Sequence, residues 1–171
     1  MIYLDYAGAA PVRKEVRKVV ARMGKYFANP SSKHDAGNRA QWMIDGARKE
    51  IKQLLNAKEN DKLIFTSSGT ESINLALKGV AFANKKKGNH IITSKIEHKA
   101  VLETCRYLEQ EGFAVTYLDV DQFGRVNPKD VEKAITKKTI LISIMYANNE
   151  VGTIQPIKEI AAIARKKKVL F

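Results

Sequence analysis

Short apolar runs alternate with amphipathic segments along most of the 171-residue chain. Three runs have the length of buried strands and are bounded by turn residues: His90 to Thr93, Ala114 to Leu118 and Ile140 to Met145. Apolar residues at helical spacing occupy two stretches between them, at about 98–111 and 128–135. This alternation is typical of βαβ units. The chain is therefore predicted to be an α/β protein, with a mostly parallel sheet flanked by helices.

The first third of the chain carries longer helical patterns. Ile2 to Leu4 is predicted to be a short strand, and a loop of small residues leads from Asp5 to Pro11. Pro11 is a residue type that often starts a helix, and the apolar positions that follow keep helical spacing. A second, longer helix is predicted for about residues 35–55, because its apolar stripe holds the helical period throughout.

The stretch from Leu63 to Ser72 reads as strand, turn and helix. Leu63, Ile64 and Phe65 suit a buried parallel strand, and Thr66 to Thr70 is a turn of small hydroxyl residues with one glycine, Gly69. The free N–H groups and the positive dipole end of the following helix would point at this turn. It is therefore a candidate phosphate site, although the same residues also make an ordinary helix N-cap.

Loops after two predicted strands bring polar side chains to the same edge of the sheet. Glu97-His98 follows the strand at 90–93, and the loop from Ala147 to Thr153 leaves the strand at 140–145. His98 could transfer protons, but the local pattern favours a helix-start histidine bonded to backbone. A last helix begins at Pro156, and Val169 to Phe171 begins a further strand whose face is expected to need another segment to cover it.

Composition limits the chemistry. The chain is 44% hydrophobic and 28% charged, as in ordinary globular proteins, and its N-terminus shows no signal or membrane segment, so a cytoplasmic location is expected. The sole cysteine, Cys105, lies on an apolar helical face and is expected to be a core residue. His34 and His90 are expected to be loop and strand-edge residues, and no histidine pair has the spacing of metal ligands.

The net charge of +12 is compatible with nucleic acid, a phosphorylated ligand, an acidic protein or a lysine-rich surface. The basic residues form short runs at predicted helix ends and turns: Lys85 to Lys87, Lys137-Lys138 and Arg165 to Lys168. Aromatic residues do not interleave them, which argues against a nucleic-acid groove and favours a solvated surface.

Five motifs in order resemble one enzyme family, the cysteine desulfurases of the NifS/IscS type, within the class V aminotransferases. The motifs are Leu4-Asp5-Tyr6-Ala7 with Pro11, Asn29-Pro30-Ser31-Ser32, Phe65 to Ser72, Glu97 to Val101 and Asn148-Asn149-Glu150-Val151-Gly152. The resemblance covers the whole chain, from its first predicted strand to its last residue.

The resemblance implies the fold-type I fold of pyridoxal 5'-phosphate (PLP) enzymes and the conversion of L-cysteine to L-alanine, with the sulfur carried as a persulfide. Iron–sulfur cluster biosynthesis is the usual setting. Gly69 and Thr70 would hold the PLP phosphate, His98 would stack on the ring and transfer protons, and Asn149 would hydrogen-bond the ring oxygen or nearby substrate. Residues 1–34 would be an arm and helix near the site entrance, and 35–171 the N-terminal half of the PLP-binding domain.

The family's later residues are missing from this sequence. These are the aspartate at the ring nitrogen, the Schiff-base lysine, the persulfide-forming cysteine and the arginine that binds the substrate carboxylate. We therefore expect a split enzyme, inactive alone, whose C-terminal-half chain carries the lysine and cysteine and pairs with the strand at Val169 to Phe171. A fragment of a longer chain is the other explanation of the length.

The expected partners are that second half, L-cysteine and a sulfur acceptor or scaffold protein, in an oligomer of paired halves. Two competing functions stay open. One is a related PLP enzyme, such as a selenocysteine lyase or an aminotransferase. The other is a catalytically inactive scaffold that binds a sulfur acceptor or nucleic acid.

Overall fold

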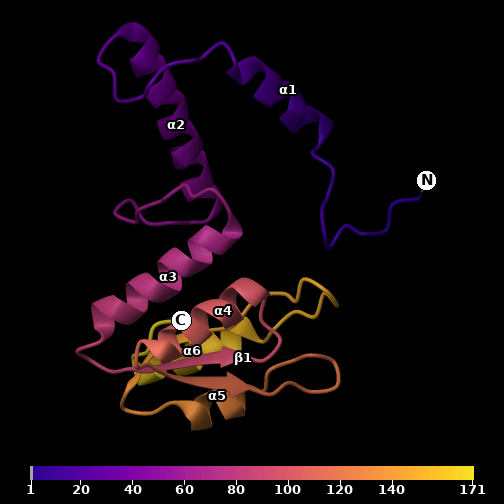
Figure 1. Ribbon diagram of the computed structural model, residues 1–171, viewed down its shortest axis with the longest axis vertical. Helices are drawn as coiled ribbons and strands as arrows, with labels where there is room; N and C mark the ends of the chain where they lie inside the picture. Colours follow the sequence, from indigo (N-terminus) through magenta and orange to yellow (C-terminus); the bar gives the residue numbers. More distant parts are fainter. Residues whose placement is uncertain (1) are drawn as a thin grey trace. The chain divides into compact units, whose positions relative to one another are not determined.

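The computed structural model describes residues 2–171, and the chain divides into two compact units, Met1–Phe65 and Thr66–Phe171. The first unit contains two helices, α1 (Lys14–Met23) and α2 (Asp35–Leu54) (Figure 1). Helix α1 begins at Lys14 and not at Pro11, because Arg13 is extended, with φ −57° and ψ 146°. His34 is the N-cap of α2, where its Nδ1 accepts a hydrogen bond from the N–H of Gly37 at 3.2 Å.

Two predicted strands are wrong. The described residues 2–65 contain no strand, so neither Ile2 to Leu4 nor Leu63 to Phe65 is part of a ladder. Both segments have suitable side chains, but a strand exists only when a second strand satisfies its backbone N–H and C=O groups. The first unit offers none among its described residues.

A parallel sheet is the centre of the second unit, as predicted. It has three strands in the order β2-β1-β3, with β1 at His90–Ser94, β2 at Ala114–Leu118 and β3 at Thr139–Ser143. Both pairings are parallel, and β1 aligns His90 with Ala114 on one side and with Thr139 on the other. The β3 ladder ends at Ser143, two residues earlier than predicted, because the N–H of Met145 bonds to a side chain outside the sheet.

Helices cover both faces of this sheet. Helices α3 (Gly69–Asn84) and α4 (Lys99–Gln110) pack with Ile91 in one core cluster, together with Leu77, Cys105 and Leu108. Helices α5 (Pro128–Ala134) and α6 (Ile157–Lys167) pack in a second cluster around Ile92 and Ile142 (Figure 1). Ile91 and Ile92 join different clusters because successive strand residues face opposite sides, and a strand buried on both sides must be apolar throughout.

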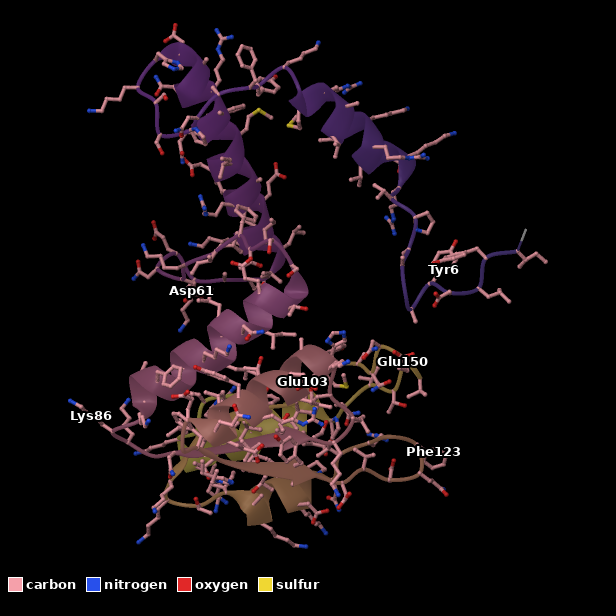
Figure 2. All side chains as sticks on the ribbon, in the orientation of Figure 1. Tyr6, Asp61, Lys86, Glu103, Phe123 and Glu150 are labelled. Atoms are coloured by element: carbon pink, nitrogen blue, oxygen red, sulfur yellow. The ribbon has the colours of Figure 1, made fainter. Side chains whose placement is uncertain are left out.

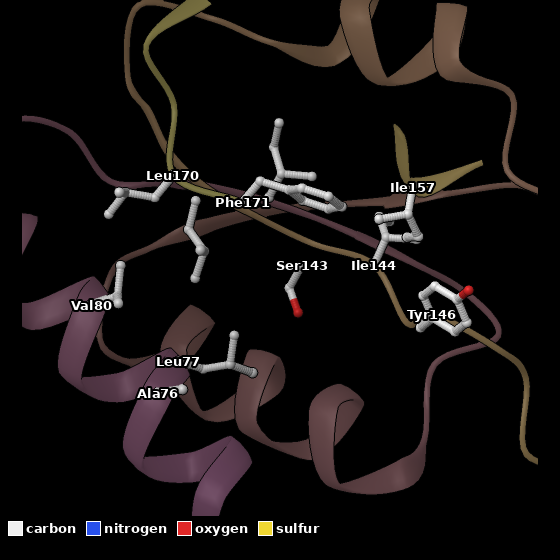
Figure 3. Close-up of a pocket in the computed structure, with 11 residues that line it drawn as sticks. Ala76, Leu77, Val80, Ser143, Ile144, Tyr146, Ile157, Leu170 and Phe171 are labelled. Atoms are coloured by element: carbon white, nitrogen blue, oxygen red, sulfur yellow. The ribbon is translucent and has the colours of Figure 1, made fainter. Parts of the chain in front are cut away.

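The outer edge of β3 carries one more pairing, from the end of the chain. Leu170 forms a parallel bridge with Leu141, and its C=O accepts the N–H of Ile142 at 2.8 Å. The strand predicted for Val169 to Phe171 is thus present only as this bridge, and Leu170 and Phe171 are 51% and 43% exposed rather than buried. Beside it lies an open apolar cavity of about 530 Å³, with Leu77 and Val80 of α3 on one wall and Phe171 on the other (Figure 3).

The helices described over residues 2–171 do not include one with both the length and the apolar character that a membrane crossing demands.

Candidate functional site

The N-terminus of α3 is a turn rich in hydrogen-bond donors. Ser68 is its N-cap, and the Oγ of Ser68 accepts the N–H of Glu71 at 3.2 Å. The carboxylate of Glu71 reaches back over the turn, where its Oε2 accepts the N–H and the hydroxyl of Ser67 at 2.7 and 2.6 Å. These hydrogen bonds lower the pKa of Glu71. The turn therefore already stabilises a negative charge.

Three further donors in the turn are free. Within the described residues, the backbone N–H groups of Gly69 and Thr70 and the hydroxyl of Thr70 have no hydrogen-bond partner in the chain. A Cβ built on Gly69 would meet no atom outside its own helix within 4 Å, so the space beside its Cα is open. Free N–H groups at the start of a 16-residue helix, with open space before them, fit the requirements of a phosphate group.

His98 is the N-cap of α4. Its Nδ1 accepts the N–H of Ala100 at 3.1 Å, which places the proton of the neutral ring on Nε2. The side chain is nevertheless exposed and lines an open cavity of about 450 Å³ between α3 and α4. Thr70 lines the same cavity, so the structure brings the turn before α3 and the imidazole to one hollow.

Glu97, the residue before His98, is 7% exposed and joins two loops. The Oε1 of Glu97 accepts the hydroxyl of Ser94 at 3.0 Å and the N–H of Met145 at 2.8 Å. One carboxylate thus ties the turn after β1 to the segment after β3. Burial raises the pKa of Glu97, although both hydrogen bonds work in the opposite direction.

Asn148 makes a second tie between the same two segments. Its Nδ2 donates to the C=O of Ile96 at 3.1 Å, and its Oδ1 accepts the N–H groups of Glu150 and Val151 at 2.9 and 3.0 Å. Asn149 is next in the chain and exposed, and its Nδ2 donates to Glu150 Oε1 at 2.8 Å. Asn149 does not line the cavity that holds Thr70 and His98, although its loop is fixed to the loop of His98.

Gln155 was not recognised from the sequence, yet it fixes a third loop at this edge. It is 3% exposed, its Oε1 accepts the N–H of Val126 at 2.9 Å and its Nε2 donates to the C=O of Gly124 at 2.7 Å. The loop around Phe123 and the loop around Glu150 leave the same end of the sheet (Figure 2). No local signal could have revealed Gln155, because its partners lie about thirty residues away. For Glu97 and Asn148, their position directly after buried strands was a usable signal.

The remaining candidate residues lie in the core. Cys105 is 0% exposed, and burial together with the charges of Glu109 and Glu97 raises the pKa of its thiol to about 12, as suits a core residue and not a nucleophile. His90, predicted to be an ordinary strand-edge residue, is buried, and its two ring nitrogens lie 2.7 and 2.9 Å from the hydroxyls of Thr139 and Thr116. Burial lowers the pKa of His90. No three His, Cys, Asp or Glu side chains of residues 2–171 are grouped to hold a metal ion.

Comparison with known proteins places this chain in a family. The family model for aminotransferase class-V matches residues 2–171. The cysteine desulfurase IscS of Dictyoglomus turgidum is 54% identical over 99% of this chain and 43% of that protein. The enzyme of the same name from Methanosarcina thermophila is 53% identical over 99% of this chain and 42% of that protein.

Solved structures give the same result for the fold. A structure described as SspA in complex with cysteine has a TM-score of 0.91 and 42% identity, over 98% of this chain and 48% of that one. A NifS-like protein has a TM-score of 0.92 and 41% identity, over 97% of this chain and 46% of that one. Nearly all of this chain is matched, and it spans a little under half the length of these relatives.

Proposed function

The chain belongs to the aminotransferase class-V family, and we propose that it forms the N-terminal half of a cysteine desulfurase. The observation that carries the proposal is the cavity shared by Thr70 and His98, with the unpaired N–H of Thr70 at its rim, in a chain 54% identical to a cysteine desulfurase. The substrate is proposed to be L-cysteine and the products L-alanine and a persulfide sulfur.

The turn before α3 fits the phosphate of PLP. Gly69 and Thr70 would supply N–H donors and a hydroxyl, and the dipole of α3 would favour the anion. The Glu71 carboxylate occupies the donors of Ser67 and leaves those of Gly69 and Thr70 free, so the two anions need not compete for the same groups. PLP, when bound, would supply the electron-accepting ring that makes C–S cleavage feasible.

His98 and Asn149 would act beside that ring. The bond from Ala100 to Nδ1 fixes the plane of the imidazole and leaves Nε2–H exposed, so His98 can offer a flat face and a proton at one known atom. Asn149 would donate a hydrogen bond to the ring oxygen or to substrate after releasing Glu150. Glu97 and Asn148 would keep both loops in place.

The lysine and the cysteine of the reaction are proposed to lie outside these 171 residues. Within the chain, Lys95 pairs with Asp119 at 2.5 Å and Cys105 is fully buried, so neither is suited to the task. We propose that a C-terminal-half segment supplies both residues and adds strands beyond β3, where Leu170 makes a single bridge beside an open apolar cavity. The cytoplasmic location, the sulfur acceptor, the arm at residues 1–34 and an oligomer of paired halves stay predictions.

The test is reconstitution. The chain is co-expressed with a tagged C-terminal half, matched in length to the part of the Dictyoglomus relative that this chain does not cover. We expect co-purification, a PLP absorbance band in the complex and release of sulfide from L-cysteine in the presence of a thiol reductant. Faster turnover of selenocysteine, or amino transfer to a 2-oxo acid without sulfide release, would overturn the desulfurase assignment. Separation of the halves on gel filtration would overturn the complementation.

A further inference from the structure

The basic runs of the sequence meet at one edge of the sheet. Lys85 to Lys87 precede β1, Lys137-Lys138 precede β3, and Arg165 to Lys168 precede the bridge at Leu170. Because the strands are parallel, the connections that precede them lie at the same edge, opposite the candidate site. Figure 2 shows Lys86 at the end of the sheet away from Glu150 and Phe123. We call these three runs the basic edge.

Backbone contacts hold the runs of the basic edge together. The N–H of His90 donates to the C=O of Lys138 at 2.9 Å, and a Cβ on Gly88 would lie 2.2 Å from that same oxygen. The connection before β1 is therefore packed directly on the connection before β3. A cavity of about 350 Å³ opens between the runs, and four lysines line it: Lys87, Lys137, Lys167 and Lys168.

Few of these charges are neutralised. In the described part of the chain, Lys167 is the member of the basic edge with a carboxylate partner, Glu132 at 3.5 Å, and that pair is half exposed. Lys85 donates instead to the C=O of Glu111 at 3.2 Å. Lysines that converge without carboxylates repel one another, and an anionic ligand would relieve that repulsion.

Lys168 adds an independent observation. It is the residue just after α6 and has the left-handed conformation, with φ 57° and ψ 35°. Glycine is favoured at such a helix end because a side chain is strained there. A lysine at this position is less stable than glycine would be, yet it contributes a cation to the cavity.

We propose that the basic edge is a docking surface for an acidic segment of a partner protein. Carboxylates of the segment would pair with the four lysines, and aliphatic side chains between them would contact Ile140 and Val169, two apolar residues of the lining. A protein is favoured over nucleic acid because the lining contains no aromatic residue on which bases could stack. The docking surface is at the opposite edge from the candidate site and does not depend on the proposed desulfurase activity.

Binding is tested with the 171-residue chain, alone and with its C-terminal half, by fluorescence anisotropy. The probes are a labelled peptide of alternating Glu and Leu and a single-stranded oligonucleotide of equal charge. We expect the triple variant Lys87→Gln/Lys137→Gln/Lys167→Gln to weaken peptide binding about tenfold. The matched control Lys49→Gln/Lys58→Gln/Lys62→Gln removes the same charge elsewhere and is expected to change binding less than about twofold. Equal losses in both variants, or tighter binding of the oligonucleotide than of the peptide, would overturn the proposal.

Lys168→Gly separates binding from folding. It is expected to raise the melting temperature, because glycine relieves the left-handed strain, and to weaken peptide binding in the same sample. Undiminished peptide binding by Lys168→Gly would show that Lys168 is not part of the docking surface. Unchanged sulfide release by the triple variant in the reconstituted enzyme would show that the docking surface and the proposed active site are separate.

Discussion

The two edges of the three-stranded sheet use polar residues in opposite ways. At the edge where the strands end, Glu97, Asn148 and Gln155 are buried and make hydrogen bonds to backbone groups of other loops. At the edge where they begin, lysines of three connections surround a cavity, and the described residues provide one carboxylate among them. The same strands thus carry a rigid edge and a charged edge.

The comparison separates two kinds of polar contact, those that hold loops in position and those that attract charged ligands. Buried hydrogen bonds between loops hold in place the backbone segment that carries His98. Exposed like charges fix nothing, but they create a field that favours anions over a longer range. Substitutions at the rigid edge are therefore expected to change activity and stability, and substitutions at the charged edge are expected to change the binding of anionic ligands.

The largest effect is expected from His98. In the reconstituted enzyme, His98→Ala should lower sulfide release by about 100-fold or more, the usual contribution of a proton-transferring group. His98→Asn is the control, because asparagine can still cap α4. Comparable losses in both variants, with normal unfolding by urea, would support the catalytic role. Full activity in His98→Asn would reduce His98 to a helix cap.

The next effect concerns the tie between the loops. Glu97→Ala leaves the partly buried N–H of Met145 without its acceptor, so the free energy of unfolding should fall by about 1–3 kcal/mol. Urea unfolding of the chain measures this loss. Glu97→Gln keeps an oxygen at the same place, so its free energy of unfolding is expected to fall by less. An equal loss in both variants would mean that the charge, and not the hydrogen bonds, holds the loops.

The pH dependence of stability further distinguishes the effect of the Glu97 charge from the effect of its hydrogen bonds. The pKa of Glu97 is raised above its usual 4.5 in the folded state, so folding favours its protonated form. Its contribution is full below pH 4.5 and is lost as the pH rises through the raised pKa. Stability of the parent should therefore decline relative to Glu97→Gln above pH 4.5. Parallel curves for the two proteins would contradict the burial of a titrating carboxyl.

A smaller effect is expected at Gly69. Gly69→Ala should leave the free energy of unfolding unchanged or slightly higher, because a Cβ there meets no neighbour and alanine favours helix. The same methyl group would stand where a phosphate must approach, so PLP should bind about tenfold more weakly in the reconstituted complex. Absorbance titration with PLP measures this. Unaltered PLP binding would show that the phosphate does not bind beside Gly69.

The smallest effect is expected at the charged edge. Glu132→Gln removes the carboxylate beside Lys167, and the stability lost with this half-exposed pair should be below about 1 kcal/mol. The acidic peptide should bind slightly more tightly, because Lys167 is then free. Weaker binding of the peptide would show that Glu132 organises the surface instead of opposing it.

The sequence predicted most elements of the second unit. The strand at Ala114–Leu118 and the helix from Pro128 were found within a residue, because their apolar periods are local and their ends carry turn residues. The ends of parallel strands share an edge, and this rule places His98 and the loop of Asn149 at the same edge of the sheet. Thr70 does not follow a strand, and it lines the same cavity as His98 because α3 packs beside α4. Their proposed roles came from the resemblance and stay predictions.

Only the tertiary structure decided the features that depend on distant partners. Leu63 to Phe65 has the side chains of a strand, but hydrogen bonding to a neighbour determines whether it becomes one. Gln155 bonds to backbone about thirty residues away, and no pattern in the sequence links the two. The lysine runs looked like separate solvated ends of helices, and the parallel sheet brought them to one edge. Local periodicity can be read from the sequence alone. The pairing of strands and the gathering of lysines at one edge depend on which segments the fold places side by side.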